Sequence, residues 1–232
     1  MKSFVWILIL LSISPAYAAD LARHEGSVKA YEAEDKLSFP PVGEIVVIGS
    51  STITNWGTIK ADLSPLNIIP RGFGGSTIDE VDYYLDRIVL AYAPRTVVIY
   101  EGDNELAEGQ TPQYIAGRFA DVTARIHARF PSARVYVISV KPSLSRWRLW
   151  ESSKQLNMLL EAWTKSDSRL AYIEAASALL GADGMPIASY YADDRLHLSI
   201  SGYEAWTKAI KPQLIALESR KTPNPPALGP VR

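Results

Sequence analysis

Short apolar runs alternate with amphipathic stretches from Gly43 onward, and this alternation limits the chain to few folds. Five of the runs are apolar without a clean two-residue period, as expected of parallel strands that are covered on both faces. They span residues 44–48, 66–69, 96–100, 135–139 and 170–173. Because strands that alternate with helices favour a parallel sheet, we expect an α/β fold with functional groups at the carboxyl ends of the strands.

Helix signals lie between the apolar runs. Thr77 and Glu80 form a capping box ahead of an apolar stripe, which predicts an amphipathic helix. Pro212 should kink or end the last helix, because proline lacks the N–H that the helical ladder uses. Three further helices are predicted, across residues 112–129, across 156–163 and from Ser201 onward, and residues 19–40 should hold one helix and a connector.

The start of the chain has the pattern of a secretory signal peptide. Lys2 precedes an apolar run that is too short to span a bilayer, and Ala16-Tyr17-Ala18 supplies an A-x-A cleavage pattern. We therefore predict a signal peptide at 1–18 that is cut after Ala18, with an uncleaved anchor as the alternative. The domain is expected at 19–219, followed by a disordered, proline-rich tail at 220–232.

The formal net charge of the chain is −1. Nucleic acids and anionic membrane surfaces bind proteins with a surplus of Lys and Arg, so this balance argues against both as main partners. The chain has no cysteine, so disulfides cannot support it. With the signal peptide, these features predict a secreted or periplasmic bacterial protein that is not stably inserted in a membrane after signal cleavage. The number of subunits is left open.

Small and polar residues follow the first three predicted strands. Ser51 follows the first strand and offers a nucleophilic oxygen. Gly75 follows the second, where a glycine lets a backbone N–H approach a ligand closely. Asn104 follows the third and offers a side-chain N–H donor. Each also has a plain structural interpretation: a polar strand end, a tight turn before a helix cap, and an Asx turn.

One of the three histidines lies in a segment suited to catalysis. His197 follows Asp194 by three residues, and in a turn this spacing lets the carboxylate reach Nδ1 while Nε2 stays free as a general base. A helix cap beside a surface histidine is the alternative, because so short a motif has many chance matches. His24 lies near the mature N-terminus, and His127 lies inside a predicted helix as a surface or half-buried residue.

Several familiar site patterns are missing from the sequence. The glycines at 72 and 74 would need a third glycine at 77 for a dinucleotide loop, where Thr77 stands. Ile53 occupies the last position of a G-x-S-x-G motif around Ser51, which excludes the nucleophile elbow of α/β-hydrolases. There is no H-E-x-x-H motif and no His/Asp cluster, so no metal site is expected.

Four blocks in order, together spanning nearly the whole mature domain, resemble the SGNH (GDSL-like) hydrolase family. They resemble, in turn, the G-D-S block, the block whose glycine donates a backbone N–H, the G-x-N-D block and the D-x-x-H block. Their key residues here are Ser51, Gly75, Asn104, and Asp194 with His197. Two positions depart from the family: Ser50 stands where G-D-S has Asp, and Glu105 stands where G-x-N-D ends in Asp.

The resemblance implies a three-layer α/β/α, flavodoxin-like fold with a five-stranded parallel sheet. It also implies ester hydrolysis without a cofactor or metal. Ser51 would attack the ester carbonyl, His197 would move the proton, and Asp194 would orient the imidazole. The N–H groups of Ser51 and Gly75 and the Asn104 amide would hold the oxyanion.

The expected substrate is a small-molecule ester with a short acyl group, with acetyl esters of carbohydrates as one case. Arg146 and Trp147, in a stretch that resembles one found in some family members, are the expected substrate contacts, and Trp56 and Trp150 lie in similar loops. The alternatives are a surface position for Arg146 and a place in a helix core for Trp150. Lysophospholipase or thioesterase activity on the same scaffold is one alternative. A catalytically inactive module that binds glycan or lipid is another, and Ser50 is the one feature in its favour.

Overall fold

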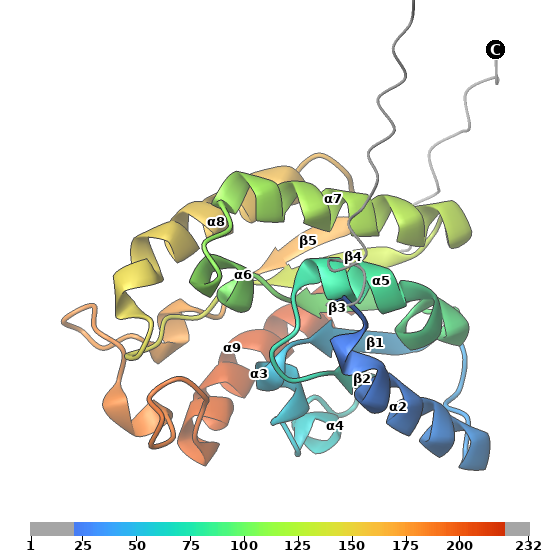
Figure 1. The fold of residues 1–232 in the computed structure, drawn as a ribbon, viewed down its shortest axis with the longest axis horizontal. Helices are drawn as coiled ribbons and strands as arrows, with labels where there is room; N and C mark the ends of the chain where they lie inside the picture. The colour runs from blue at the N-terminus through green and yellow to red at the C-terminus, as the bar shows by residue number, and fades with distance from the viewer. Residues whose placement is uncertain (1–20, 221–232) are drawn as a thin grey trace, which may run out of the picture.

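A single parallel sheet organises the protein. The computed structural model describes residues 21–220, so the predicted signal peptide and all of the predicted tail except Arg220 lie outside the described residues. The five strands pair in the order β2-β1-β3-β4-β5, and every pairing is parallel. They are β1 (Ile45–Gly49), β2 (Ile68–Gly72), β3 (Thr96–Tyr100), β4 (Arg134–Ile138) and β5 (Leu170–Ile173). The expected three-layer α/β/α, flavodoxin-like fold is confirmed (Figure 1).

Alternate residues of the strands pack into two separate cores, one on each face of the sheet. In β1, Val46 and Ile48 contribute to the first core, whereas Ile45 and Val47 contribute to the second. Because both faces are covered, all five residues of β1 are buried, which explains why the strands are continuous apolar runs in the sequence.

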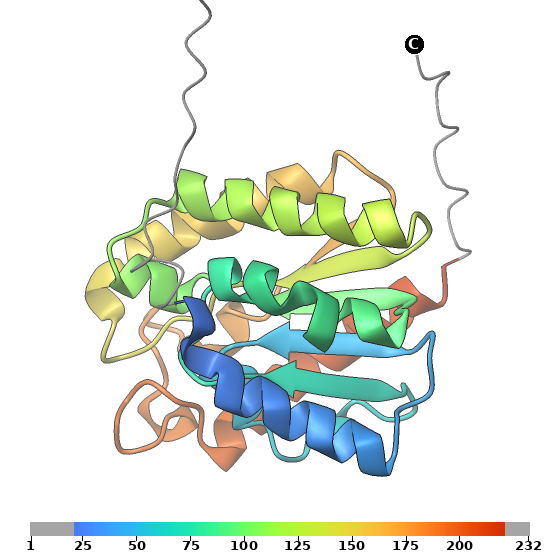
Figure 2. The ribbon, with the colours of Figure 1, turned by 45° about the vertical axis from the view of Figure 1, so that its right-hand side comes forward.

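Helices form the two outer layers, one on each face of the sheet. The first core lies under α2 (Glu25–Leu37), α5 (Ile78–Ile88), α7 (Pro112–Arg129) and α8 (Trp150–Thr164). The face that these helices cover is turned toward the viewer in Figure 2. The second core lies under α3 (Ser51–Thr54), α4 (Ile59–Asp62) and α9 (Ile200–Glu218). The remaining elements are η1 (Ala22–His24), η2 (Leu90–Tyr92), α6 (Asp103–Ala107), η3 (Trp147–Leu149), η4 (Ser177–Leu179) and η5 (Ala188–Tyr190).

The capping box predicted at Thr77 and Glu80 forms, and a second side-chain cap begins α7. At the start of α5, the Thr77 hydroxyl accepts a hydrogen bond from the Glu80 backbone N–H at 3.4 Å, and the Glu80 carboxylate accepts one from the Thr77 N–H at 2.9 Å. At the start of α7, the Thr111 hydroxyl accepts from the Tyr114 N–H at 3.2 Å. These bonds satisfy N–H groups that a helix start leaves without a partner.

Strand β2 differs from its prediction. It begins at Ile68 and continues through Pro70, Arg71 and Gly72, so it starts and ends later than the apolar run at 66–69. Strand β2 is an edge strand, where a proline is tolerated because one side of the strand makes no ladder bonds. Arg71 is buried there because its guanidinium is bonded to other side chains, and a hydropathy pattern does not register such burial.

Helix α9 also departs from the prediction in two respects. Its N-cap is Ser199, whose hydroxyl accepts from the Gly202 N–H at 3.2 Å, rather than Ser201. The helix does not end at Pro212 but continues to Glu218. Pro212 lies on the exposed side of the helix, as does Lys208, whose carbonyl the proline leaves without an N–H partner one turn earlier.

Candidate active site

The first strand delivers Ser51 to the carboxyl edge of the sheet. Gly49 ends β1, and a Cβ built on it would lie 2.5 Å from the Tyr100 carbonyl oxygen at the end of β3. Only glycine allows the two strand ends to lie this close. Ser50 is the N-cap of α3 but its side chain makes no capping bond, and Ser51 is the first helical residue. Its backbone N–H belongs to the first turn of α3, where no intrahelical acceptor exists.

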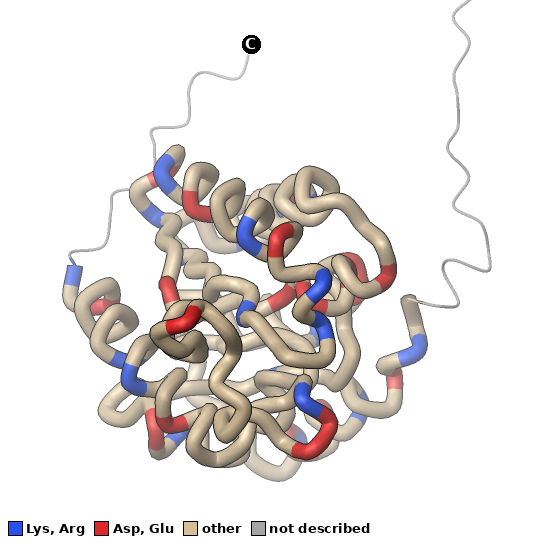
Figure 3. Tube along the Cα trace, turned by 90° about the vertical axis from the view of Figure 1, so that its left-hand side faces the viewer, with Lys and Arg blue, Asp and Glu red and all other residues tan. Residues whose placement is uncertain are grey.

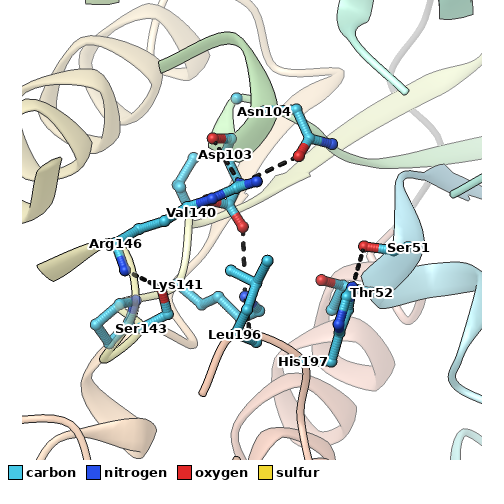
Figure 4. Close-up of polar contacts among 12 residues, drawn as sticks. Ser51, Thr52, Asp103, Asn104, Val140, Lys141, Ser143, Arg146, Leu196 and His197 are labelled. Carbon is cyan, nitrogen blue, oxygen red and sulfur yellow. Dashed lines mark hydrogen bonds and ion pairs between the residues drawn. The ribbon is translucent and has the colours of Figure 1, made fainter. Parts of the chain in front are cut away.

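Ser51, His197 and Asp194 are joined by two hydrogen bonds. Ser51 Oγ lies 2.9 Å from His197 Nε2, across a separation of 146 residues in the chain (Figure 4). His197 Nδ1 lies 2.5 Å from Asp194 Oδ2. The structure therefore brings the three residues together in the linear arrangement that proton transfer from a serine requires.

The Asp194 carboxylate also organises the turn that carries His197. Its Oδ1 accepts hydrogen bonds from the backbone N–H groups of Leu196, at 2.9 Å, and His197, at 3.0 Å. Arg195 inside the turn has a left-handed backbone with φ of 60°. The hydrogen bond from His197, supported by these two N–H groups, lowers the pKa of Asp194 to about 2. Asp194 is therefore an anion at neutral pH and favours a proton on Nδ1.

The segment after β2 lies against the serine. A Cβ built on Gly74 would lie 3.9 Å from the Ser51 Cβ, and the next residue, Gly75, has φ of +79°. A side chain at Gly75 would strain this left-handed backbone. The Gly75 carbonyl accepts a hydrogen bond from Arg23 Nη2 at 2.9 Å.

Asn104 lies in α6, directly after β3. Its Nδ2 donates to the Ser76 carbonyl at 2.9 Å, which joins α6 to the segment that holds Gly75. An asparagine amide carries two N–H donors, so this bond engages one of them. The three residues expected to hold an oxyanion thus follow β1, β2 and β3, which are neighbours in the sheet.

Two buried acids contact these segments, and the sequence had marked only Glu105, as a departure from the family motif. Glu105 accepts hydrogen bonds from the backbone N–H groups of Ile78, at 2.7 Å, and Gly102, at 2.9 Å. Burial nevertheless raises its pKa to about 7. Glu101 accepts from the Ser76 hydroxyl at 2.5 Å, and burial followed by the charge of Glu105 raises its pKa well above the usual range. Burial therefore favours the neutral form of Glu101 and places Glu105 near its titration midpoint at neutral pH.

The predicted substrate contacts have specific structural partners. Arg146 Nη1 lies 2.8 Å from Asp103 Oδ1 and donates to Asn104 Oδ1 at 3.1 Å. Trp147 stacks on Trp150 with ring centroids 6.0 Å apart, and both are half-buried. Trp56, by contrast, is a core residue that is 2% exposed and packs on α9, so placing it in a substrate loop was wrong. The role of Trp147 as a substrate contact stays a prediction.

The face toward which the strands point in Figure 1 carries charges of both signs. Figure 3 views this face, and Lys and Arg are interspersed with Asp and Glu over it. Within residues 21–220, no group of three or more His, Asp or Glu side chains is arranged to hold a metal ion. Over the same residues, no helix combines the length and apolar character that crossing a membrane requires.

The fold and the site correspond to a known family of hydrolases. The family model for GDSL-like lipases/acylhydrolases matches residues 49–205, and the chain belongs to this family. The resemblance based on the four sequence blocks is thereby confirmed, and the protein is an enzyme that hydrolyses ester bonds.

The chain is also similar to individual proteins. Human platelet-activating factor acetylhydrolase IB subunit alpha1 is 29% identical over 179 residues, which cover 75% of this chain and 76% of that protein. A GDSL-like lipase from Bacteroides thetaiotaomicron VPI-5482 has the same fold, with a TM-score of 0.67, 22% identity, and coverage of 85% of this chain and 98% of that chain. A family 3 carbohydrate esterase from Clostridium thermocellum is also similar in fold, with a TM-score of 0.61, 14% identity, and coverage of 77% and 100%.

Proposed function

We propose that the protein is a serine esterase whose triad is Ser51, His197 and Asp194. The observation that carries the proposal is the pair of hydrogen bonds from Ser51 Oγ to His197 Nε2, at 2.9 Å, and from His197 Nδ1 to Asp194, at 2.5 Å. Ser51 Oγ forms a bond to the ester carbonyl carbon while its proton moves to Nε2. That proton passes to the leaving alcohol as the ester bond breaks. Water, deprotonated by His197, then hydrolyses the acyl-enzyme.

The oxyanion of the tetrahedral intermediate would be held by donors from the three segments that follow β1, β2 and β3. The Ser51 N–H lies in the first turn of α3, the Gly75 N–H lies in the glycine segment beside Ser51, and the Asn104 amide keeps a second N–H. Such preformed donors stabilise charge that develops only in the transition state. Because these donors belong to the protein, the reaction as proposed uses no cofactor.

We propose short acyl groups, acetyl above all, as the part of the substrate that is transferred. The human relative is an acetylhydrolase and the Clostridium thermocellum neighbour is a carbohydrate esterase, so both names are consistent with small esters. The stacked pair of Trp147 and Trp150 offers an aromatic surface that suits a sugar ring. Secretion is part of the proposal and depends on cleavage after Ala18, which N-terminal sequencing of the exported protein tests.

A comparison of nitrophenyl esters of increasing chain length tests the proposal. We expect the highest kcat/KM with the acetyl ester and a loss of turnover in Ser51→Ala, while Ser27→Ala, an exposed serine on α2, keeps full activity. A fluorophosphonate probe should label wild type and Ser27→Ala but not Ser51→Ala, because the probe reacts only with an activated serine. Turnover by Ser51→Ala equal to that of wild type would refute the assignment.

The same experiment separates the alternatives. A preference for long acyl chains or for thioesters would indicate a lysophospholipase or a thioesterase on this scaffold. If the wild-type protein is neither labelled nor active on any ester, the inactive module that binds glycan or lipid becomes the favoured alternative.

A further inference from the structure

A buried lysine lies between the loop of His197 and the helix of Asn104. Lys141 follows β4, and its side chain is 1% exposed. Its Nζ donates to the Leu196 carbonyl at 3.0 Å and lies 3.4 Å from Asp103 Oδ2 (Figure 4). An ammonium group is rarely buried this deeply without partners, and here the two partners come from two different parts of the site.

Each partner of Lys141 is the residue directly before a proposed active-site residue in the sequence. Leu196 precedes His197, and Asp103 precedes Asn104. The Leu196 residue is bonded on both sides, because its N–H donates to Asp194 and its carbonyl accepts from Lys141. A single side chain therefore sets the spacing between the general base and an oxyanion donor.

Arg146, from the same segment as Lys141, places a second cation beside Asp103. Arg146 is ion-paired with Asp103 Oδ1 at 2.8 Å and donates to the Asp103 carbonyl at 3.0 Å. It also donates to Asn104 Oδ1 at 3.1 Å, while Asn104 Nδ2 donates to the Ser76 carbonyl. The two bonds together fix the orientation of the Asn104 amide, with Oδ1 toward Arg146 and Nδ2 toward Ser76. If the amide turned over, its NH₂ group would face the Arg146 guanidinium and its oxygen would face a carbonyl.

The Asp103 carboxylate is the centre of this arrangement. Burial would raise its pKa, yet the charges of Lys141 and Arg146 hold the pKa of Asp103 below its usual value, so it remains an anion between two cations. Buried ion pairs of this kind contribute little net stability compared with apolar residues of the same volume. The cluster is better explained by the geometry that it imposes on its neighbours.

We propose that Lys141 and Arg146 are positioning residues that hold the His197 loop and the Asn104 amide in place relative to Ser51, through Asp103. The proposal rests on the proposed esterase function. The contacts of Arg146 Nη1 with Asp103 and Asn104 carry this role, and contact of Arg146 with the substrate stays a separate prediction.

The Arg146 part is tested by combining Arg146→Met with Asn104→Ala. The probe is nitrophenyl acetate, with kcat expressed per site labelled by fluorophosphonate. In the wild-type background we expect Arg146→Met to lower kcat by roughly 10–10² with little change in KM, because a small misplacement of a catalytic group has effects of this size. In the Asn104→Ala background we expect almost no further loss. Equal losses in both backgrounds, or a higher KM with unchanged kcat, would overturn this part.

The Lys141 part is tested with Lys141→Met, which keeps an unbranched apolar side chain and removes the ammonium group. We expect lower kcat and slower fluorophosphonate labelling per folded molecule. The matched control is Arg134→Met at the opposite end of β4, since Arg134 is also buried and pairs with Glu218 at 3.6 Å. We expect Arg134→Met to leave both rates unchanged.

Each outcome bears on one proposal only. Wild-type labelling and turnover rates in folded Lys141→Met would overturn the role of Lys141. If Lys141→Met does not fold, the half-buried Arg146 and its double-mutant comparison decide the proposal. Absence of Ser51-dependent turnover in the wild-type protein would instead refute the esterase function.

Discussion

The Glu105 carboxylate accepts a hydrogen bond of 2.7 Å from the backbone N–H of Ile78, the first residue of α5. Its other oxygen accepts from the Gly102 N–H at 2.9 Å. One buried side chain thus joins the start of the helix that follows Gly75 to the loop that precedes Asn104. Glutamate stands here where the family motif has aspartate, and its carboxylate, one methylene further from the backbone, is fully engaged in this bridge.

The buried position of Glu105 predicts a pH-dependent stability. Burial raises the pKa of Glu105 to about 7, whereas an exposed glutamate titrates near 4.3. Between these values the folded state holds a proton that the unfolded state lacks, so the free energy of unfolding decreases as pH rises, by up to ~1.4 kcal/mol per pH unit. Glu105→Gln removes this contribution and should flatten the profile in urea unfolding between pH 4.5 and 8. Parallel profiles for the two proteins would contradict the assignment.

Asp194→Asn should inactivate the enzyme without unfolding it. The amide cannot supply the charge that stabilises the imidazolium and favours the wrong tautomer of His197, so we expect kcat to fall by about 10⁴, as in serine proteases. Asp193→Asn, at the neighbouring exposed aspartate, is the control and should keep wild-type turnover. Retention of more than a tenth of the activity by Asp194→Asn would be incompatible with a triad role for Asp194.

Asn104→Ala should act on kcat rather than on KM. Removing one oxyanion donor lowers kcat by about 10²–10³, because the lost hydrogen bond forms fully only in the transition state. Steady-state kinetics with a short nitrophenyl ester measure both constants. A rise in KM at constant kcat would identify Asn104 as a binding residue instead.

Gly49→Ala should destabilise the fold at the base of the site. The new Cβ would lie 2.5 Å from the Tyr100 carbonyl oxygen and 2.6 Å from the Ile53 side chain, and the backbone carbonyl cannot rotate away as a side chain can. Overpacking of this kind costs about 1–3 kcal/mol. Gly57→Ala, where an added Cβ meets nothing within 4 Å, is the matched control. Thermal unfolding should show a lower Tm for Gly49→Ala alone.

The sequence predicted the sheet well because its central strands are buried on both faces. Thr96–Tyr100 begins and ends where the apolar run does, since every residue of this strand is buried. Strand β2 was misplaced because burial of its last residues depends on pairing rather than on apolar character: the Arg71 guanidinium bonds to the Tyr92 hydroxyl at 2.7 Å and to Asp35 at 2.6 Å. These partners lie 21 and 36 residues away in the chain, beyond the range of a local pattern.

The site residues could be predicted where a short sequence motif corresponds to a local backbone conformation. Ser51 lies at a strand end, and the Asp194 to His197 spacing forms a turn, so both could be found from short segments. Lys141 and Glu105 act through contacts with segments far away in the chain, such as the 55 residues between Lys141 and Leu196. The stretch at 140–147, which resembles one found in some family members, contains Lys141 as well as Arg146, and this was the one signal available for the lysine. Trp56 was misassigned because nothing local distinguishes a loop tryptophan from one that packs on a distant helix.

Residues 195 and 196, between Asp194 and His197, are held through their main-chain atoms, by the Asp194 carboxylate and the Lys141 ammonium among others. The N–H and the carbonyl of Leu196 are both engaged, and the left-handed backbone of Arg195 is one that glycine or asparagine adopts readily. The side chains at 195 and 196 therefore take no part in keeping the acid and the base together. Evolution, or a directed library at these two positions, can remodel the surroundings of the histidine and retune substrate preference without dismantling the catalytic pair.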